Sequence, residues 1–328
     1  MLELAIGAII AALIFDFVNG LNDAANSVAT VIGTRVLKPS YAVLLAAVAN
    51  FVGPFVFGVA VATTIAKGII NPEDVTTYMI IGGLAGAITW ASLCTYFGLP
   101  ISVSHSLIGG LIGTGLATVG PEKLLFDGLF KVGIGIISSP LGGLVIGFVL
   151  AGIIMTIFAR HHPSKVNSIF GKLQLISSAW FALTHGANDG QKTMGIIVLI
   201  LLSEGILTEF EVPLWVIFIA ASAIALGTFA GGYKVIKTLG MKVARLRPYQ
   251  GFAAETGGGI VLGIFAVLGI PASTTHAITG SIMGASAAKR KLAVRWKVGR
   301  QIVFAWLITI PGSAAIAYIS TLIIHVFV

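Results

Sequence analysis

The stretch Gly20-Leu21-Asn22-Asp23-Ala24-Ala25-Asn26-Ser27 decides how the chain folds, because a close copy of it returns at Gly186-Ala187-Asn188-Asp189-Gly190-Gln191-Lys192-Thr193. Each copy places an Asn-Asp pair inside a long apolar run, with a second polar side chain one turn later. Acidic residues within membrane segments are rare, and most of them are functional. The repeat therefore predicts a functional site inside a membrane. The plainer alternative is a chance pair of acids at helix ends.

The composition is that of a polytopic membrane protein. Of the 328 residues, 57% are hydrophobic and 10% are charged, and the mean hydropathy is +1.01. Apolar stretches recur that are long enough, at about 20 residues, to cross a hydrocarbon core of roughly 30 Å as helices. Strands of alternating polarity, which a membrane barrel needs, are absent from the sequence. We expect an all-α polytopic membrane protein with about 10 to 12 membrane helices.

The net charge of +8 arises from the loops, and we expect no nucleic-acid partner. Sixteen cations form four clusters that contain no acid, in residues 35–38, 160–172, 234–247 and 289–300. The acids of the remaining connections lie in residues 73–74, 122–127 and 204–211. Cytoplasmic loops are enriched in Lys and Arg. We therefore expect the basic clusters inside, both termini outside, and a multi-pass protein of the cell (inner) membrane surrounded by lipid.

A second repeated element predicts helical hairpins. The stretch Gly98-Leu99-Pro100-Ile101-Ser102-Val103-Ser104-His105 matches Gly269-Ile270-Pro271-Ala272-Ser273-Thr274-Thr275-His276 at a constant offset of 171 residues. Gly and Pro break a helix, and the charge pattern makes both arms of each hairpin enter from one face. We expect broken or re-entrant hairpins over residues 78–117 and 251–288, the first entered from outside and the second from the cytoplasm.

These repeats predict two halves of opposite orientation. Residues 1–159 form the first inverted repeat, residues 160–172 a cytoplasmic linker, and residues 173–328 the second repeat with a terminal helix. Residues 41–66 and 213–233 are expected to be single spans, and the Asn-Asp motifs to lie on unwound backbone that lines a wet cavity. Inverted repeats are typical of secondary transporters, which bind their substrates near the membrane midplane.

The Asn-Asp motifs have the chemistry of a cation site. Asp23 and Asp189 supply anionic oxygens, and Asn22, Asn26 and Asn188 supply neutral carbonyl oxygens. Such hard ligands suit a small cation such as sodium better than a transition metal. Asp16 is expected near the outer end of its helix, without a role.

The hairpin tips have the chemistry of an anion site, because a helix that begins after each Gly-x-Pro break directs free N–H groups toward the tip. The hydroxyl groups there belong to Ser102, Ser104, Ser273, Thr274 and Thr275, and Gln191 of the second motif is added to this anion-binding set. The alternative is that the hydroxyls are N-caps only.

Four further polar residues have two interpretations each. Glu255, mid-arm in the second hairpin, is a candidate for proton or cation coupling, or it makes a fixed polar contact to a neighbouring helix. Lys192 binds an anion or pairs with a motif aspartate. His105 and His276 bind an anion or are buried with satisfied partners.

The motifs resemble those of the inorganic phosphate transporter family of sodium- or proton-coupled symporters. Gly186-Ala187-Asn188-Asp189 and the two Ser-x-Ser/Thr-His tips are similar to its signatures, and Glu255 falls at an acid important in many members. The resemblance implies inorganic phosphate as the anion, a co-transported cation and a homodimer. Gln191-Lys192 departs from the usual Ala-Asn, and Asn50 stands where some relatives carry an acid.

The leading hypothesis is a secondary active transporter, not an enzyme, that imports inorganic phosphate with sodium through a composite midplane site. Sodium is the co-transported ion, and no other cofactor is expected. The nearest alternatives are proton-coupled or metal-phosphate symport by the same fold. More distant ones are a passive anion channel and an intramembrane aspartyl protease, in which Asp23 and Asp189 would share a proton.

Overall fold

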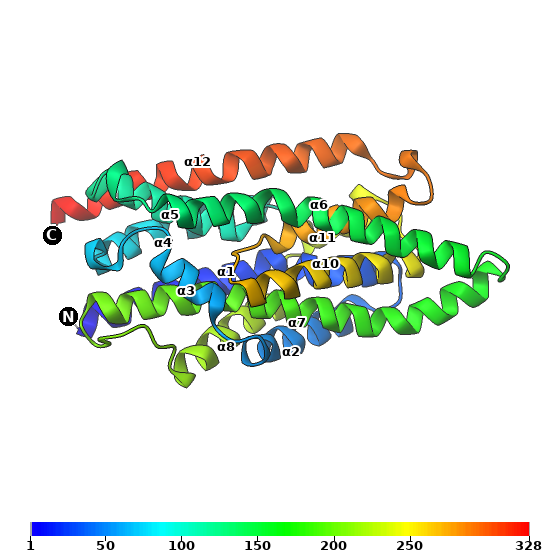
Figure 1. The fold of residues 1–328 in the computed structure, drawn as a ribbon, viewed down its shortest axis with the longest axis horizontal. Helices are drawn as coiled ribbons and strands as arrows, with labels where there is room; N and C mark the ends of the chain where they lie inside the picture. Colours follow the sequence, from blue (N-terminus) through cyan, green and yellow to red (C-terminus); the bar gives the residue numbers. More distant parts are fainter. Residues whose placement is uncertain (1, 328) are drawn as a thin grey trace.

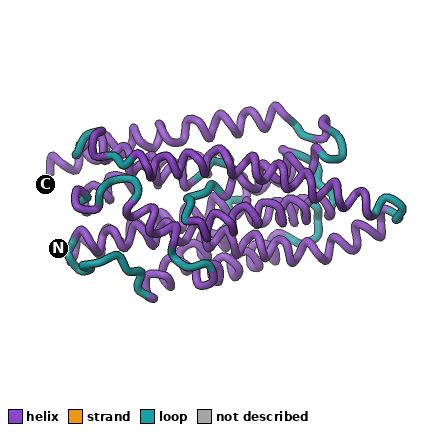
Figure 2. Tube along the Cα trace, viewed as in Figure 1, coloured by secondary structure: helices purple, strands orange, loops and turns teal. Residues whose placement is uncertain are grey.

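The computed structural model describes residues 2–327 as a bundle of helices that run along one long axis (Figure 1). The helices are α1 (Leu2–Gly33), α2 (Pro39–Val56), α3 (Ala60–Lys67), α4 (Thr77–Phe97), α5 (Val103–Thr118), α6 (Phe126–Ile157), α7 (Pro163–Ser203), α8 (Leu214–Ala230), α9 (Tyr233–Lys237), α10 (Pro248–Leu268), α11 (Thr274–Ala287) and α12 (Trp296–Phe327). Figure 2 shows only helices and loops in this part of the chain. The all-α prediction is confirmed.

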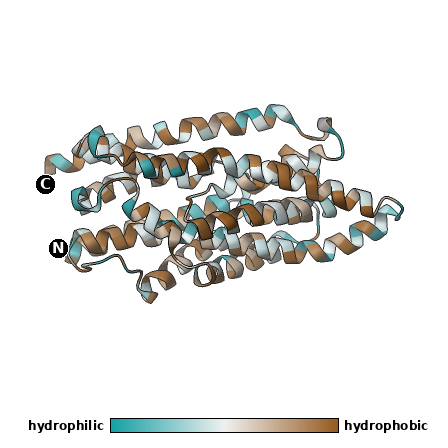
Figure 3. Cartoon of the chain, viewed as in Figure 1, coloured by the Kyte–Doolittle hydropathy of each residue, from teal (hydrophilic) through white to brown (hydrophobic). Residues whose placement is uncertain are grey.

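Six of these helices are long and apolar enough to cross a membrane: α1, α2, α4, α6, α10 and α12. A seventh span results if α8 is joined to its continuation through α9 to Val243, which is bent by 63°. Hydrophobic residues dominate the helices, and hydrophilic ones gather at the loops and ends (Figure 3). The chain is a membrane protein, as its composition predicts.

Each predicted hairpin is a pair of helices joined by a short break, α4–α5 and α10–α11. The first arm ends at Gly98 or Gly269, with φ of 69° and 65°, a conformation that glycine adopts without strain. The second arm is capped by Ser102 or Ser273, whose Oγ accepts a hydrogen bond of 3.2 Å from the backbone N–H of the histidine three residues later. The N-cap interpretation therefore holds for these two serines.

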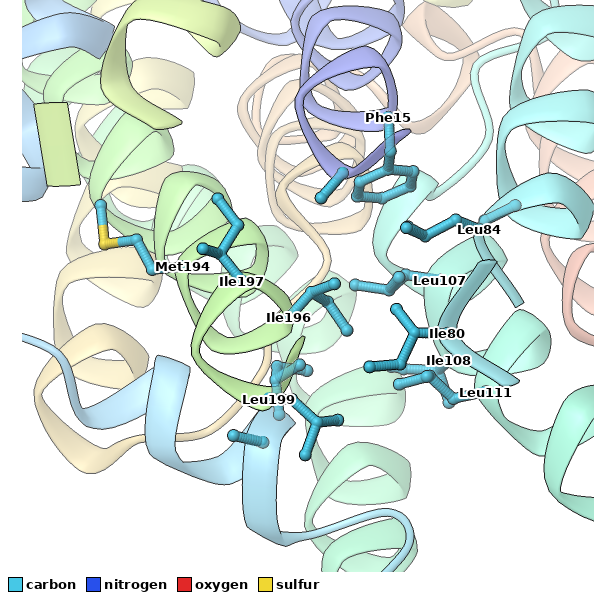
Figure 4. Packing of buried hydrophobic residues seen from close by; sticks show 14 of the residues in the cluster. Phe15, Ile80, Leu84, Leu107, Ile108, Leu111, Met194, Ile196, Ile197 and Leu199 are labelled. Atoms are coloured by element: carbon cyan, nitrogen blue, oxygen red, sulfur yellow. The ribbon is translucent and has the colours of Figure 1, made fainter. Parts of the chain in front are cut away.

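The two repeated Asn-Asp motifs lie on α1 and α7, which pack against each other and against both hairpins. Around Phe15 of α1, apolar side chains of α4, α5 and α7 interlock, among them Leu84, Leu107 and Ile196 (Figure 4). Small residues bring the backbones close: a Cβ on Gly186 would lie 2.3 Å from the carbonyl oxygen of Asn50. Close crossings of this kind are typical of membrane helices.

Two local expectations are wrong. The motifs lie within continuous helices, and the helix breaks that contact them are those of the hairpin tips. The expected single span 41–66 is divided into α2 and α3, because Pro54 lacks an N–H and Gly58 adopts φ of 74°. The linker 160–172 is mostly the first turns of α7, which begins at Pro163.

Candidate functional site

The carboxylates of the two motifs meet where α1 and α7 cross, at the tip of the second hairpin. The hydroxyl of Thr274 lies 3.0 Å from Oδ2 of Asp23 and 3.2 Å from Oδ2 of Asp189. A hydroxyl has one proton, so it donates to one carboxylate at a time. All three side chains are buried. The structure thus brings together two acids that are 166 residues apart in the sequence.

The second hairpin tip is tied to the first motif. The amide of Asn26 donates to Oγ1 of Thr275 at 2.9 Å and of Thr274 at 3.3 Å. Thr275 donates to the carbonyl oxygen of Ile101 at 2.8 Å, with Oδ1 of Asp23 at 3.3 Å. Because Ile101 belongs to the first tip, both tips meet at the motif crossing.

Lys192 joins the second motif to both tips. Its ammonium forms an ion pair with Oδ1 of Asp189 and donates to Oγ of Ser104 at 2.5 Å and to the carbonyl oxygen of Ala272 at 2.9 Å. The side chain is only 1% exposed. Of the two interpretations of Lys192, the ion pair with a motif aspartate is the one observed.

His185 is a site residue that the sequence analysis missed. Its Nε2 lies 3.7 Å from Oδ2 of Asp23 and 3.4 Å from Oδ2 of Asp189. Its Nδ1 lies 3.0 Å from Oδ1 of Asn50, whose amide donates to Thr228. The sequence spacing could have predicted this position. His185 precedes Asp189 by four residues, and residues four apart lie on the same face of a helix.

Asp23, His185 and Asp189 can together hold a metal ion. One ligand atom of each lies within 4.8 Å of the others. Two carboxylates suit a hard cation, and the imidazole extends the set toward transition metals such as zinc. The preference for a small cation over a transition metal was predicted from the oxygen ligands alone, and His185 adds an imidazole to them.

Two other predicted ligands, Asn22 and Gln191, have partners away from this crossing. The amide of Asn22 donates to Thr95 at 2.7 Å, and Oε1 of Gln191 accepts from the backbone N–H of Val61 at 2.8 Å, at the start of α3. Asn188 is fully buried, and neither of its amide atoms has a hydrogen-bond partner.

Glu255 lies in a separate cluster. Its carboxylate accepts hydrogen bonds from Oγ1 of Thr30 at 2.5 Å, from Nε2 of Gln174 at 3.0 Å and from Oγ of Ser177. Thr30 is seven residues beyond Asp23 on α1, which places the cluster about 10 Å along the helix from the central acids. The fixed polar contact is the arrangement observed for Glu255.

The two tip histidines touch each other instead of the acids. The rings of His105 and His276 are 4.6 Å apart between centroids, and His276 stacks on Trp306 at 3.7 Å. Both line an apolar cavity of about 430 Å³ between α6, α11 and α12. The indole N–H of Trp306 donates to the carbonyl oxygen of Pro100, which ties α12 to the first tip.

Several buried polar atoms near the crossing have no hydrogen-bond partner. They are Oδ1 of Asn19, Asn22 and Asn26, both amide atoms of Asn188, both carboxylate oxygens of Asp16, Nε2 of Gln191, Oγ1 of Thr193 and Nε2 of His185. Buried polar groups are normally paired, so unpaired ones need an explanation such as a bound ion or water. Oxygen atoms predominate, which favours a cation.

A helical membrane protein with broken hairpins that meet at a buried charged centre has the architecture of a secondary transporter. The chain matches the phosphate transporter family over residues 19–317, and it belongs to that family. The family resemblance is thereby confirmed, and membership in a transporter family excludes the aspartyl protease hypothesis.

Similar proteins and a similar structure agree with this assignment. A probable low-affinity inorganic phosphate transporter of Rhizobium meliloti is 50% identical over 96% of this chain and 94% of its own length. One of Bacillus subtilis is 40% identical over 99% and 98%. A solved structure described as the sodium-dependent phosphate transporter has a TM-score of 0.89 at 25% identity and covers 99% of this chain.

Proposed function

We propose that this protein imports inorganic phosphate by symport with sodium, through a site where α1 and α7 meet the two hairpin tips. The relatives named as low-affinity inorganic phosphate transporters support phosphate as the substrate. The sodium-dependent phosphate transporter of similar structure supports sodium as the coupled ion. The single observation that carries the proposal is that Thr274 and Thr275, which belong to the anion-binding tips, contact the carboxylate of Asp23 directly.

The cation half of the proposed site is built from Asp23 and Asp189 with the neutral oxygens of Asn22, Asn26 and Asn188. Carboxylate and amide oxygens suit a hard cation. The side-chain oxygens of Asn22, Asn26 and Asn188 are buried without a hydrogen-bond partner, so none of them is already used by another contact.

The anion half is built from the tip hydroxyls and the N-termini of α5 and α11. Ser104 and Thr275 hold corresponding positions in the two tips, each beside a motif side chain. Ser102, Ser273 and Thr274 complete the set of hydroxyl groups. Helix N-termini with hydroxyl groups favour phosphate through their free N–H groups and their dipole.

Phosphate and the motif acids repel each other unless a cation lies between them. Like charges at 4 Å cost about 4 kcal/mol at an effective dielectric of 20. Sodium bound between Asp23 and the tip turns this repulsion into an attraction. Linkage then requires that bound sodium increase the affinity for phosphate by the same factor by which bound phosphate increases the affinity for sodium.

The proposal includes the arrangement in the membrane. We place the basic clusters on the cytoplasmic side of the cell (inner) membrane, with both termini outside, the halves 1–159 and 173–328 in opposite orientation, and a homodimer as the assembly. The start of α1 and the end of α12 lie at the same end of the molecule, as this arrangement requires (Figure 1).

The test is phosphate uptake into proteoliposomes at fixed pH, with sodium titrated against potassium at constant ionic strength. We expect uptake to rise with sodium and to concentrate phosphate above equilibrium when a sodium gradient is imposed. Uptake that never exceeds equilibrium would identify a passive channel.

Proton-coupled or metal-phosphate symport is a second candidate, which Lys192 and His185 favour. Lys192 already neutralises Asp189, so this half of the site needs no second sodium ion. His185 lies against both motif acids and completes a three-residue metal cluster with them. Uptake driven by a pH gradient without sodium, or dependent on a divalent cation, would select this candidate.

A further inference from the structure

A third buried acid lies on the same face of α1 as Asp23, outside the central site. Asp16 precedes Asp23 by seven residues, which is two helical turns and about 10 Å along the helix. From the sequence we expected Asp16 near the outer end of its helix, without a role. The structure buries it completely, at 0% exposure.

The Asp16 carboxylate lies among oxygen atoms that have no partner. Neither of its oxygens accepts a hydrogen bond within the described part of the chain. Thr193 of α7, and Asn19 one turn later on α1, lie near enough for their side chains to interact with this carboxylate. Oγ1 of Thr193 and Oδ1 of Asn19 are themselves without a partner. The nearby ammonium of Lys192 is already bound to Asp189, Ser104 and the carbonyl oxygen of Ala272.

Asp16, Asn19 and Thr193 place four oxygen atoms in one buried site, of which only the Thr193 hydroxyl carries a proton that it can donate to Asp16. An ionised carboxylate without a partner costs several kcal/mol in such surroundings. A proton on Asp16 would satisfy one acceptor only, whereas a metal ion is coordinated by several oxygens at once. Carboxylate, amide and hydroxyl oxygens suit a hard ion better than a transition metal.

We propose that Asp16, Asn19 and Thr193 form a second sodium site, on the side of the central site where α1 begins. Thr193 follows Asp189 by four residues on α7, and Asp16 precedes Asp23 by seven on α1, so both helices place this site in the same direction from the central acids. In the proposed orientation that direction is outward. The site holds an entering sodium ion before the ion reaches Asp23.

This inference rests on the proposed sodium coupling, and a binding measurement separates the two. Sodium that binds the folded chain raises its thermal stability. The purified full-length protein in detergent, without phosphate, is titrated with sodium chloride against choline chloride at constant ionic strength. The variants are Asp16→Asn, Asp23→Asn and the double variant, with Asp127→Asn, an exposed acid in the first turn of α6, as the matched control.

We expect each single variant to keep part of the sodium-induced rise in Tm and the double variant to lose it, while Asp127→Asn behaves as the wild type. If Asp23→Asn alone removes the whole response, the second site is overturned and sodium coupling stands. If the wild type shows no response, sodium coupling and the second site both fail.

Transport supplies an independent readout. In proteoliposomes, Asp16→Asn should raise the sodium concentration for half-maximal uptake about tenfold, the change expected when one charged ligand is lost. The phosphate KM at saturating sodium should not change. Thr193→Val, which keeps the volume and removes the hydroxyl, should shift the sodium dependence in the same direction by less. A raised phosphate KM with unchanged sodium dependence in both variants would overturn the site.

Discussion

The two Asn-Asp motifs differ at one position, and the difference changes the electrostatics of the site. One turn after Asp23 the first motif has Asn26, whose neutral amide contacts Thr274 and Thr275 of the second tip. One turn after Asp189 the second motif has Lys192, whose ammonium contacts Ser104 of the first tip. We infer that the second half carries its own cation, whereas the first half takes a mobile one. A repeated sequence thus builds a site with two unequal halves.

The largest expected difference between the halves is in stability. Asp189→Asn leaves the buried Lys192 without its counterion, which should lower the free energy of unfolding by about 3 to 5 kcal/mol. Asp23→Asn leaves no buried cation unpaired and should cost much less, although both variants should lose coupled uptake. Thermal unfolding in detergent measures this difference. Asp189→Asn with Lys192→Met is the control and should recover most of the loss, whereas equal destabilisation by both single variants would contradict the asymmetry.

Replacement of Lys192 by Asn should make the two halves alike. Asp189 then has no fixed counterion, so we expect a second mobile cation to enter and the Hill coefficient for sodium to rise by about one. Simultaneous uptake of radioactive sodium and phosphate gives the stoichiometry. Lys192→Arg, which keeps the charge, is the control. An unchanged stoichiometry in Lys192→Asn would show that Lys192 replaces no transported ion.

The corresponding hydroxyls of the tips should separate anion from cation binding. Ser104→Ala should weaken the binding of phosphate by about 1.5 to 3 kcal/mol, because a hydrogen bond to a charged partner is lost. Thr275→Ala should weaken phosphate binding by a similar amount. It should also weaken sodium binding, because Thr275 lies beside Asp23. Calorimetry with and without sodium measures both effects. Phosphate affinity that is indifferent to sodium would rule out a shared site.

Glu255 has no acidic counterpart in the first hairpin, where Leu84 stands at the matching position. Glu255→Gln keeps the volume but loses charge-assisted hydrogen bonds to Thr30, Gln174 and Ser177, so we expect a moderate loss of stability. If Glu255 is a coupling residue, phosphate exchange between two equal pools should persist while net uptake slows. Equal rates of exchange and net uptake, relative to the wild type, would leave Glu255 with a structural role only.

The smallest effect on uptake is expected from a cysteine introduced for labelling at the junction of the two halves. Ser164, near the start of α7, is exposed, and the single native cysteine, Cys94, is buried. Ser164→Cys should leave uptake unchanged and should resist a membrane-impermeant maleimide in intact cells. Reaction in permeabilised cells is the control. Efficient labelling from outside would contradict the opposite orientation of the halves.

The sequence by itself was enough to determine the class, the hairpins and the two aspartates that meet at the helix crossing. The length of an apolar segment and the charge of a loop are local properties. They can be compared directly with the thickness of a bilayer and with the Lys and Arg content typical of cytoplasmic loops. The hairpin breaks follow equally from Gly98, Gly269 and the prolines after them, because those residues restrict their own backbone. An Asp that recurs inside apolar runs can be recognised from the sequence as a candidate functional residue, because acids within membrane segments are rare and usually functional.

Only the tertiary structure decided which polar groups meet. Asn22 and Gln191 sit in the motifs yet face Thr95 and α3, whereas His185 lies outside the motif and faces both acids. The crossing of α1, α7 and α10 likewise decides that Asp16 is buried near Thr193. It also decides that three donors bind the carboxylate of Glu255. Side-chain partners across helices are set by crossing angle and rotation, and neither quantity is encoded in the spacing of a single segment.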